Sequence, residues 1–455
     1  MRELFLPSTT HPHATTLCAP MAGSRRRRRR RAHSSQLGVE LSPLADATLS
    51  TREVTIVEIP SKNNCHTSGY TSWTSSGPHV CADLLDTLLH EIIVLISSFH
   101  DFLAFISTCR SWRAALSSFP SVYTFSFPPF HFEPFGPYFL PHSRGIKCLL
   151  LSNCKWQLTD PCKKNFSLRR SVPQNTPDTM HYLGCSFGYL IFTYEEDYLL
   201  VDAYTGAKVK PPKLPYDIRI GWFSGIGMLT APFRSSNSRL LLFSRASMFE
   251  WQVGTDSWSE YPLNLGRERV HQTVLFKGYI YVIDVLLRLH TIQLTPQFSI
   301  QEVDITWESL HTLPINPWLV VCSDMLLMVD LTLRSDKELS SSIFEVFRLD
   351  FSVEPAKWLK MEKLENHALF VSLDKRNPAF SCMNPERWGG KSNCIYVARL
   401  FEDPDETWTV VELGQPMQNS KSTVHCTHYS WTSFPDHSQI GSLWLFLSLV
   451  YGASQ

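Results

Sequence analysis

Apolar residues between positions 81 and 119 recur at spacings of three and four, a pattern typical of amphipathic helices. A first helix follows Asp83 as a candidate N-cap, a second opens at His100-Asp101, and a third holds Trp112 inward. The apolar stripe of the first helix comprises Leu84, Leu85, Leu88, Leu89, Ile92, Ile93 and Ile96. Three short helices cannot bury all of these faces against one another, so we expect apolar surface to remain for a partner.

From about residue 144 onward, short β-rich runs separated by polar turns replace the helical spacing. Tryptophans recur at spacings of 49, 51 and 50 residues, at Trp258, Trp307, Trp358 and Trp408. A period near 50 with about four short strands per unit is typical of a kelch-like β-propeller. About 310 residues at this period predict about six blades, with five or seven also compatible. A large β-sandwich, or two β domains, is the alternative fold.

Two sets of strands support the repeat. The expected strands lie at residues 188–192, 198–201, 239–243, 249–253, 278–282, 324–329, 344–349 and 394–397. The apolar run at residues 442–451 is about half of the ~20 residues that a membrane span needs, and we expect it to be a strand that closes the ring on the first blade.

The remaining segments are predicted to be irregular. Residues 1–80 are rich in Ser, Thr, Pro and His, and we expect disorder there. Residues 120–143 are dense in Phe and Pro and predict an extended connector before a propeller at 144–452. Three interpretations of the arginine run in the tail stay open: a nuclear-localisation or anion-binding patch, part of a transit peptide, or an extension without function. The run consists of Arg25, Arg26, Arg27, Arg28, Arg29, Arg30 and Arg31.

Composition is that of a soluble globular protein, with 42 basic and 42 acidic residues. Residues 1–72 hold 10 of the basic and 5 of the acidic residues, so the remainder is mildly acidic. We therefore expect neither nucleic-acid nor membrane binding. The 12 cysteines contain no C-x-x-C pair, which favours reduced thiols in a cytosolic or nuclear protein.

The helical segment resembles the F-box, most familiar in its plant form. The resemblance rests on the first helix, the Asp101 turn and the ending Cys109-Arg110-Ser111-Trp112-Arg113. The family's opening Trp and Pro are replaced here by Cys81 and Leu85. The resemblance implies docking to the Skp adaptor of a cullin-RING ubiquitin ligase. The implied adaptor-binding residues are Leu84, Leu85, Leu88, Leu89, Ile92, Ile93, Arg110, Trp112 and Arg113.

The C-terminal region resembles the KIB-type propeller found in plant F-box proteins. The similarity is carried by Leu183-Gly-Cys-Ser-Phe-Gly-Tyr-Leu190, by Val201-Asp-Ala-Tyr-Thr-Gly206 with the following Pro211-Pro-Lys-Leu-Pro215, and by Asn393-Cys-Ile-Tyr396. The combined resemblance implies a non-catalytic substrate receptor that presents an unknown target protein to the ligase. The first alternative is an interaction protein whose F-box has degenerated.

Candidate chemistry is weak elsewhere in the chain. Gly184-Cys185-Ser186-Phe187-Gly188 matches the G-x-S-x-G elbow and leaves a serine hydrolase using Ser186 as a second alternative. The strand pattern that follows is not the helix that such an elbow requires, so a tight turn is the favoured interpretation. His425-Cys426-Thr427-His428 has no second cluster to complete a metal site, and no cofactor is predicted. The basic loop Arg387-Trp388-Gly389-Gly390-Lys391 is interpreted as a connection between blade strands, with a partner contact as the alternative.

Overall fold

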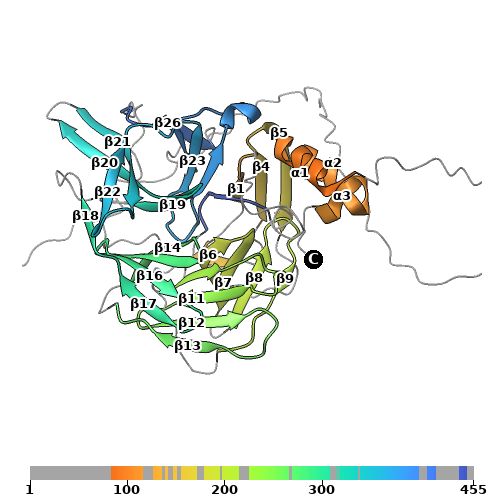
Figure 1. Cartoon of the computed structure of the whole chain (residues 1–455). Helices are drawn as coiled ribbons and strands as arrows, with labels where there is room; N and C mark the ends of the chain where they lie inside the picture. Colours follow the sequence, from red (N-terminus) through yellow and green to blue (C-terminus); the bar gives the residue numbers. More distant parts are fainter. Residues whose placement is uncertain are drawn as a thin grey trace, which may run out of the picture. The chain divides into compact units, whose positions relative to one another are not determined.

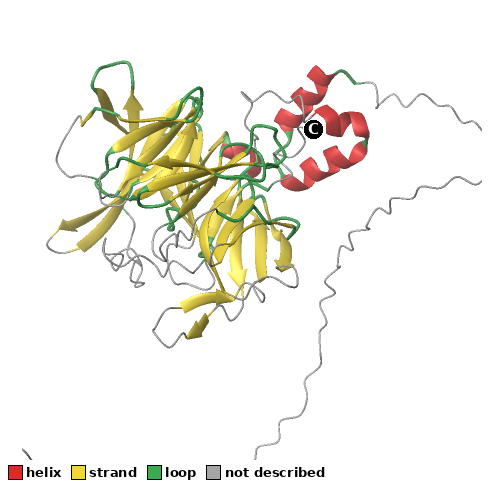
Figure 2. Cartoon of the chain, turned by 90° about the horizontal axis from the view of Figure 1, so that it is seen from below, coloured by secondary structure: helices red, strands yellow, loops and turns green. Residues whose placement is uncertain are grey.

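The computed structural model describes residues 84–115, 127–135, 139–141, 147–150, 155–171, 179–194, 197–214, 225–265, 269–307, 314, 317–336, 339–398, 407–416 and 440–447. All of these belong to one compact unit, Ser76–Gln455. The chain is mainly β, with three α-helices and one short 3-10 helix among the described residues. Figure 2 shows the helices gathered together, while strands make up most of the rest.

Three helices occupy the N-terminal part of the described chain: α1 (Asp86–Leu95), α2 (Phe99–Thr108) and α3 (Arg110–Ala115). α2 begins after Ser98, whose hydroxyl accepts a hydrogen bond from the Asp101 backbone N–H and donates one to the Asp101 carboxylate. This reciprocal cap fixes the turn between the first two helices. α1 begins two residues after Leu84 and has no side-chain cap, and the expected cap Asp83 lies outside the described residues.

The described strands form six sheets, the six blades of a β-propeller (Figure 1), which agrees with the predicted blade count. The first blade has the order β27 (Leu443–Leu445), β1 (Phe130–Phe135), β4 (Lys155–Asp160) and β5 (Lys163–Ser171). The second has the order β2 (Phe139–Pro141), β3 (Lys147–Leu150), β6 (Thr179–Ser186), β7 (Tyr189–Tyr194), β8 (Asp197–Asp202) and β9 (Lys208–Val209).

The third blade comprises β10 (Ile226–Leu229), β11 (Arg239–Phe243), β12 (Ser247–Gln252) and β13 (Ser259–Pro262). The fourth comprises β14 (Val270–Phe276), β15 (Tyr279–Asp284), β16 (Leu289–Gln293) and β17 (Ser299–Glu302). The fifth has the order β18 (Ile305–Trp307), β22 (Ala356–Met361), β21 (Leu339–Asp350), β20 (Met325–Asp336) and β19 (Trp318–Cys322). The sixth has the order β24 (Phe380–Met383), β23 (His367–Ser372), β25 (Cys394–Ala398) and β26 (Trp408–Glu412).

The ring closes through β27, as predicted from the apolar run near the C-terminus. β27 pairs antiparallel with β1, with Phe132 opposite Leu443 and Phe130 opposite Leu445. Trp444 of the same strand is fully buried, and its indole N–H donates to the Tyr396 carbonyl of the sixth blade at 3.1 Å. The last described strand therefore belongs to the first blade by backbone pairing and to the sixth blade by side-chain packing.

Two expectations about boundaries and period need correction. The structure places β1 inside the expected connector 120–143, where Phe130 and Phe132 are buried, so the propeller begins before residue 144. The repeated tryptophans also do not each belong to a different blade. Trp307 and Trp358 lie opposite each other in the parallel pair β18 and β22 of a single sheet, because β18 follows the fourth blade and joins the fifth.

Helices and propeller share one hydrophobic core. Phe99 of α2 packs edge-on against Phe130 of β1, with ring centroids 4.8 Å apart, and against Tyr204 at 5.9 Å. The Cys162 thiol, in the β4–β5 turn, donates to the Ser97 carbonyl between α1 and α2 at 3.2 Å. The same buried cluster contains Leu89, Ile93, Phe102, Phe105, Phe132, Trp156, Leu158, Tyr182 and Phe192. The three helices thus pack on the first two blades as part of one folded body.

Asp284 organises the β15–β16 turn in the fourth blade. Its carboxylate is fully buried and accepts hydrogen bonds from the Arg288 guanidinium and from the backbone N–H groups of Leu286 and Arg288. His290 lies against the same carboxylate at 3.3 Å. Burial alone would raise the pKa of Asp284, but the hydrogen bonds from His290 and Arg288 outweigh it and hold the pKa below its usual value.

Several predictions fall on residues outside the described part of the chain. These are the tail with its arginine run and the cluster His425 to His428. Among the described residues, no helix has the length and apolar character to span a membrane, and no group of three His, Cys, Asp or Glu side chains is placed to hold a metal. Six cysteines among those whose side chains are described are free thiols, and of these Cys185, Cys322, Cys382 and Cys394 are buried.

Candidate functional site

One side of α1 presents leucines to solvent. Leu85 is 70% exposed, Leu88 45% and Leu95 68%, which are large values for apolar side chains. Leu89 and Ile93, on the adjoining side, are 0% and 1% exposed and belong to the shared core. Spacings of three and seven keep the exposed leucines on one side of the helix, where together they form an apolar strip that no described residue covers. We call Leu85, Leu88 and Leu95 the leucine strip.

The structure divides the predicted adaptor-binding residues into exposed and buried groups. Leu85 and Leu88 lie on the leucine strip, whereas Leu84 and Ile92 are partly buried against the core. Leu89 and Ile93 are buried in the shared core, so in this fold their side chains pack α1 on the propeller and offer no surface to a partner. Sequence periodicity places all of these residues in one broad apolar stripe. In the structure, one part of this stripe packs against the core and the other part faces solvent.

The third helix turns Trp112 inward, as the sequence predicts, so this side chain offers little surface to a partner. Trp112 is half-buried and packs on Phe105 of α2, with ring centroids 4.8 Å apart. The Cys109 and Ser111 side chains lie 3.1 Å apart at the start of this helix. Arg110 is exposed, and the side chain of Arg113 lies outside the described residues. Trp112 therefore acts mainly as a packing residue of the helical module.

The basic loop of the sixth blade contacts the helical module. It forms the 3-10 helix η3 (Pro385–Trp388), and its Trp388 is buried against Phe370 and Tyr396. The Arg387 guanidinium donates to the carbonyls of Val94 and Leu95, at 3.1 and 3.2 Å. These carbonyls lie at the C-terminal end of α1, so the guanidinium there also complements the helix dipole. The loop connects blade strands, as predicted, and in addition fastens the end of α1 to the sixth blade.

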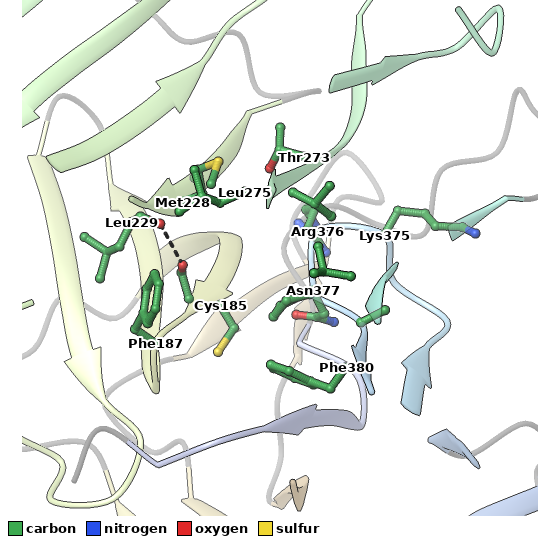
Figure 3. Close-up of a pocket in the computed structure, with 16 residues that line it drawn as sticks. Cys185, Phe187, Met228, Leu229, Thr273, Leu275, Lys375, Arg376, Asn377 and Phe380 are labelled. Carbon is green, nitrogen blue, oxygen red and sulfur yellow. Dashed lines mark hydrogen bonds between the residues drawn. The ribbon is translucent and has the colours of Figure 1, made fainter. Parts of the chain in front are cut away.

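A pocket of about 190 Å³ lies where four successive blades end a strand. Ser186 is the last residue of β6 and Leu229 the last of β10, while Leu275 and Val321 stand one residue before the ends of β14 and β19. Residues 375–379, between β23 and β24 of the sixth blade, and Phe380, the first residue of β24, supply the remaining wall. In Figure 3, Phe187 and Cys185 lie on one side of the pocket and Asn377 and Phe380 on the other.

The geometry around Ser186 gives no support to hydrolase chemistry. Its hydroxyl donates to the Leu229 carbonyl at 3.2 Å, drawn as the dashed line in Figure 3. Phe187 and Gly188 both have positive φ and form a two-residue hairpin turn between β6 and β7, which confirms the tight-turn interpretation. The residues that line the pocket include no His, Asp or Glu to act as a base. Burial also raises the pKa of the neighbouring Cys185 thiol to about 12, so it is not a thiolate nucleophile.

Residues 374–378 tie the sixth blade to the second across this region. Arg376 is paired with the Asp374 carboxylate and donates to the Tyr182 carbonyl of β6. The Tyr182 hydroxyl donates in turn to the Asn377 side-chain carbonyl. Glycine is required at position 184, where an added Cβ would lie 2.7 Å from the Gly227 carbonyl oxygen and 2.8 Å from that of Arg376. No local sequence pattern marks this segment, because its role depends on contacts with residues nearly 200 positions away.

The model of the KIB1-4 beta-propeller family matches residues 158–428, more than half of the chain. The chain belongs to this family. The KIB-type part of the resemblance is therefore confirmed, and a β-propeller of this kind favours protein–protein interaction. The match does not include the helices, so an F-box at 81–119 stays a prediction.

Comparisons with solved structures give weaker similarities to this KIB1-4 propeller. The crystal structure of the N-terminal domain of Nup159 has 11% identity and a TM-score of 0.26, covering 52% of this chain and 69% of that chain. YCF48 from Cyanidioschyzon merolae has 9% identity and a TM-score of 0.25, covering 46% of this chain and 69% of that one. Similarities at this level carry no information on function. No curated protein matches the chain significantly.

Proposed function

We propose that the chain is the substrate-recognition subunit of a Skp-cullin-F-box ubiquitin ligase, with the helices docking the Skp adaptor and the propeller binding a target protein. The observation that carries this proposal is the leucine strip, in which Leu85, Leu88 and Leu95 remain exposed on a helix whose other side is firmly anchored. An amphipathic helix with one anchored and one exposed apolar side suits helix-in-groove recognition. The propeller supplies an interaction scaffold.

In this function the chain performs no covalent step. Ubiquitin transfer belongs to the recruited conjugating enzyme, and the receptor contributes proximity and orientation. The shared core and the Arg387 contact suit that role, because they hold the docking helix in a fixed position on the blades. A target bound to the propeller would then be presented to the ligase in a defined geometry.

A pull-down with a purified Skp adaptor tests the proposal. The intact chain should recover the adaptor, and Leu85→Asp with Leu88→Asp should abolish recovery, because two carboxylates would enter an apolar contact. The matched control is Leu286→Asp, since Leu286 is 60% exposed in the β15–β16 turn of the propeller. The control should bind like the intact chain.

The alternative function is a propeller that binds a partner without recruiting a ligase. It is favoured by the departures from the F-box opening, since Cys81 and Leu85 stand where the family has Trp and Pro. Failure of the intact, folded chain to recover the adaptor would reject the ligase function and leave this alternative. Recovery that survives the double substitution would instead reject the leucine strip as the docking site.

A further inference from the structure

The fourth and fifth blades expose aromatic side chains on elements other than those of the leucine strip. Tyr279 of β15 is 43% exposed, and Phe351, in the turn between β21 and β22, is 45% exposed. The Phe351 ring lies 6.3 Å from that of Phe276 and 6.0 Å from that of Tyr281, measured between centroids. Aromatic residues are enriched where proteins contact one another. We call Phe276, Tyr279, Tyr281 and Phe351 the aromatic patch.

The β14–β15 hairpin holds one half of the aromatic patch in place. Phe276 and Tyr279 are directly opposite each other in the antiparallel pair, and Tyr281 follows two residues later on the same side of the sheet. The turn between the strands is Lys277-Gly278, and both residues have positive φ, as in the tight turns that join hairpins. Phe276 and Tyr281 are 4% and 8% exposed, so they form a buried support for the two exposed rings.

Lys277 places a cation at the aromatic patch. Its ammonium lies over the Phe276 ring, 4.9 Å from the centroid. The residue is exposed, and no carboxylate among the described residues lies within salt-bridge distance of the ammonium. A cation of this kind beside apolar surface attracts a carboxylate that a partner brings. The aromatic patch therefore favours a partner that is both apolar and acidic.

The β21–β22 turn determines on which side of the patch that carboxylate can bind. Asp350 of this turn accepts a hydrogen bond from the Ser352 backbone N–H at 2.9 Å, and Glu354 is exposed. Both residues repel a carboxylate of the partner, whereas Lys277 attracts it. A bound acidic group is therefore expected beside the β14–β15 turn and not beside the β21–β22 turn.

We propose that the aromatic patch binds a polypeptide segment of a target protein in which an aromatic or large aliphatic residue lies beside an aspartate or glutamate. The apolar side chain covers Tyr279 and Phe351, and the carboxylate pairs with Lys277. The assignment of this segment to a ligase target rests on the proposed function, whereas its binding does not require the adaptor. The surface gives the propeller a preference for acidic sequences that also contain large apolar residues.

Fluorescence anisotropy on the full chain tests the patch with labelled eight-residue peptides. The Glu peptide is Gly-Ser-Trp-Glu-Leu-Glu-Ser-Gly, and three related peptides replace Glu by Gln, Glu by Lys, or both Trp and Leu by Ser. The intact chain should bind the Glu peptide with a Kd below about 1 mM. Because an exposed ion pair contributes little, the Gln peptide should bind about two- to fivefold more weakly. The Lys peptide should bind at least fivefold more weakly, and the Ser peptide should not bind detectably.

Substitutions at the patch locate the binding. Lys277→Glu should reverse the charge preference, so that the Lys peptide binds more tightly than the Glu peptide. The matched control is Lys391→Glu, the same change of charge at an exposed residue of the sixth blade. Tyr279→Ser with Phe351→Ser should weaken binding of the Glu peptide at least fivefold. Leu286→Ser, which changes another exposed apolar residue of the fourth blade, should leave it unchanged.

The results separate this proposal from the proposed function. The patch is rejected if the intact chain does not bind the Glu peptide, if the Glu and Lys peptides bind equally, or if Lys277→Glu keeps the preference of the intact chain. Binding that survives the double serine substitution also rejects it. A chain that binds the Glu peptide through Lys277 but does not recover the adaptor keeps the binding surface and loses only the ligase function.

Discussion

Trp444 tests whether β27 closes the propeller ring. The substitution Trp444→Ala removes a side chain that is 0% exposed and packs between the first and sixth blades. Its ring lies 5.0 Å from that of Phe370 and 5.3 Å from that of His131, measured between centroids. Its indole N–H donates to the Tyr396 carbonyl at 3.1 Å. The change therefore acts on the packing and on a hydrogen bond of the closing contact.

The expected loss of stability follows from these contacts. Replacing a buried tryptophan by alanine lowers the free energy of unfolding by about 3–5 kcal/mol. Losing the hydrogen bond to Tyr396 adds about 1 kcal/mol. Trp444→Phe keeps most of the ring packing and should cost about 1–2 kcal/mol. Against a typical total of about 5–15 kcal/mol, the alanine variant should be severely destabilised.

Equilibrium urea denaturation, followed by far-UV circular dichroism, measures the effect. Trp307→Ala is the matched control, because Trp307 is only half-buried on β18 and takes no part in ring closure. We expect the control to lose less than half of the stability that Trp444→Ala loses. If Trp444→Ala costs under about 1 kcal/mol, or no more than the control, then β27 does not hold the ring closed and the reasoning fails.

Three further predictions concern contacts elsewhere in the fold. Arg387→Met should speed backbone hydrogen exchange at the end of α1 severalfold by removing the bonds to its carbonyls, while the exposed Lys391→Met should leave exchange unchanged. Because the pKa of Asp284 is lowered in the fold, its contribution to stability is present above about pH 4 and is lost as the pH falls through the lowered pKa. The variant Asp284→Asn should therefore lose less stability on acidification than the intact chain. An unchanged dependence of stability on pH below about pH 4 would contradict this. Cys185, with its pKa raised to about 12, should resist iodoacetamide at pH 8 until urea unfolds the chain, whereas the half-buried Cys109 should react first, as read by mass spectrometry.

The propeller was predictable from the sequence because its strands are buried on both sides. The run at 239–243 is found as β11 and the run at 394–397 within β25, and both consist almost entirely of buried residues. β1 was not predicted as a strand, because its sequence contains Pro134 and the surrounding residues were interpreted as a connector. Proline is tolerated there because the pairing with β27 involves only residues 130–132, which leaves position 134 without a neighbour on that side.

The candidate sites were predictable only in part. Helical spacing predicts an apolar stripe on α1, but it does not tell which leucine faces the propeller, so Leu88 and Leu89 looked equivalent. Their exposures of 45% and 0% follow from the packing of α1 on the blades. The pocket escaped prediction entirely. Its polar residue Asn377 lies in a segment whose place is set by Tyr182 and Gly184, far away in the sequence.

Ring closure by β27 also sets an order in time for folding during synthesis. Phe132 pairs with Leu443, which the ribosome adds 311 residues later. At roughly 5–20 residues per second, β1 waits about 15–60 s for its partner strand. During that interval the buried face of β1 and the helices packed on it lack part of their final cover. The nascent chain would therefore present a phenylalanine-rich strand edge to chaperones, and the synthesis of β27 would end that exposure.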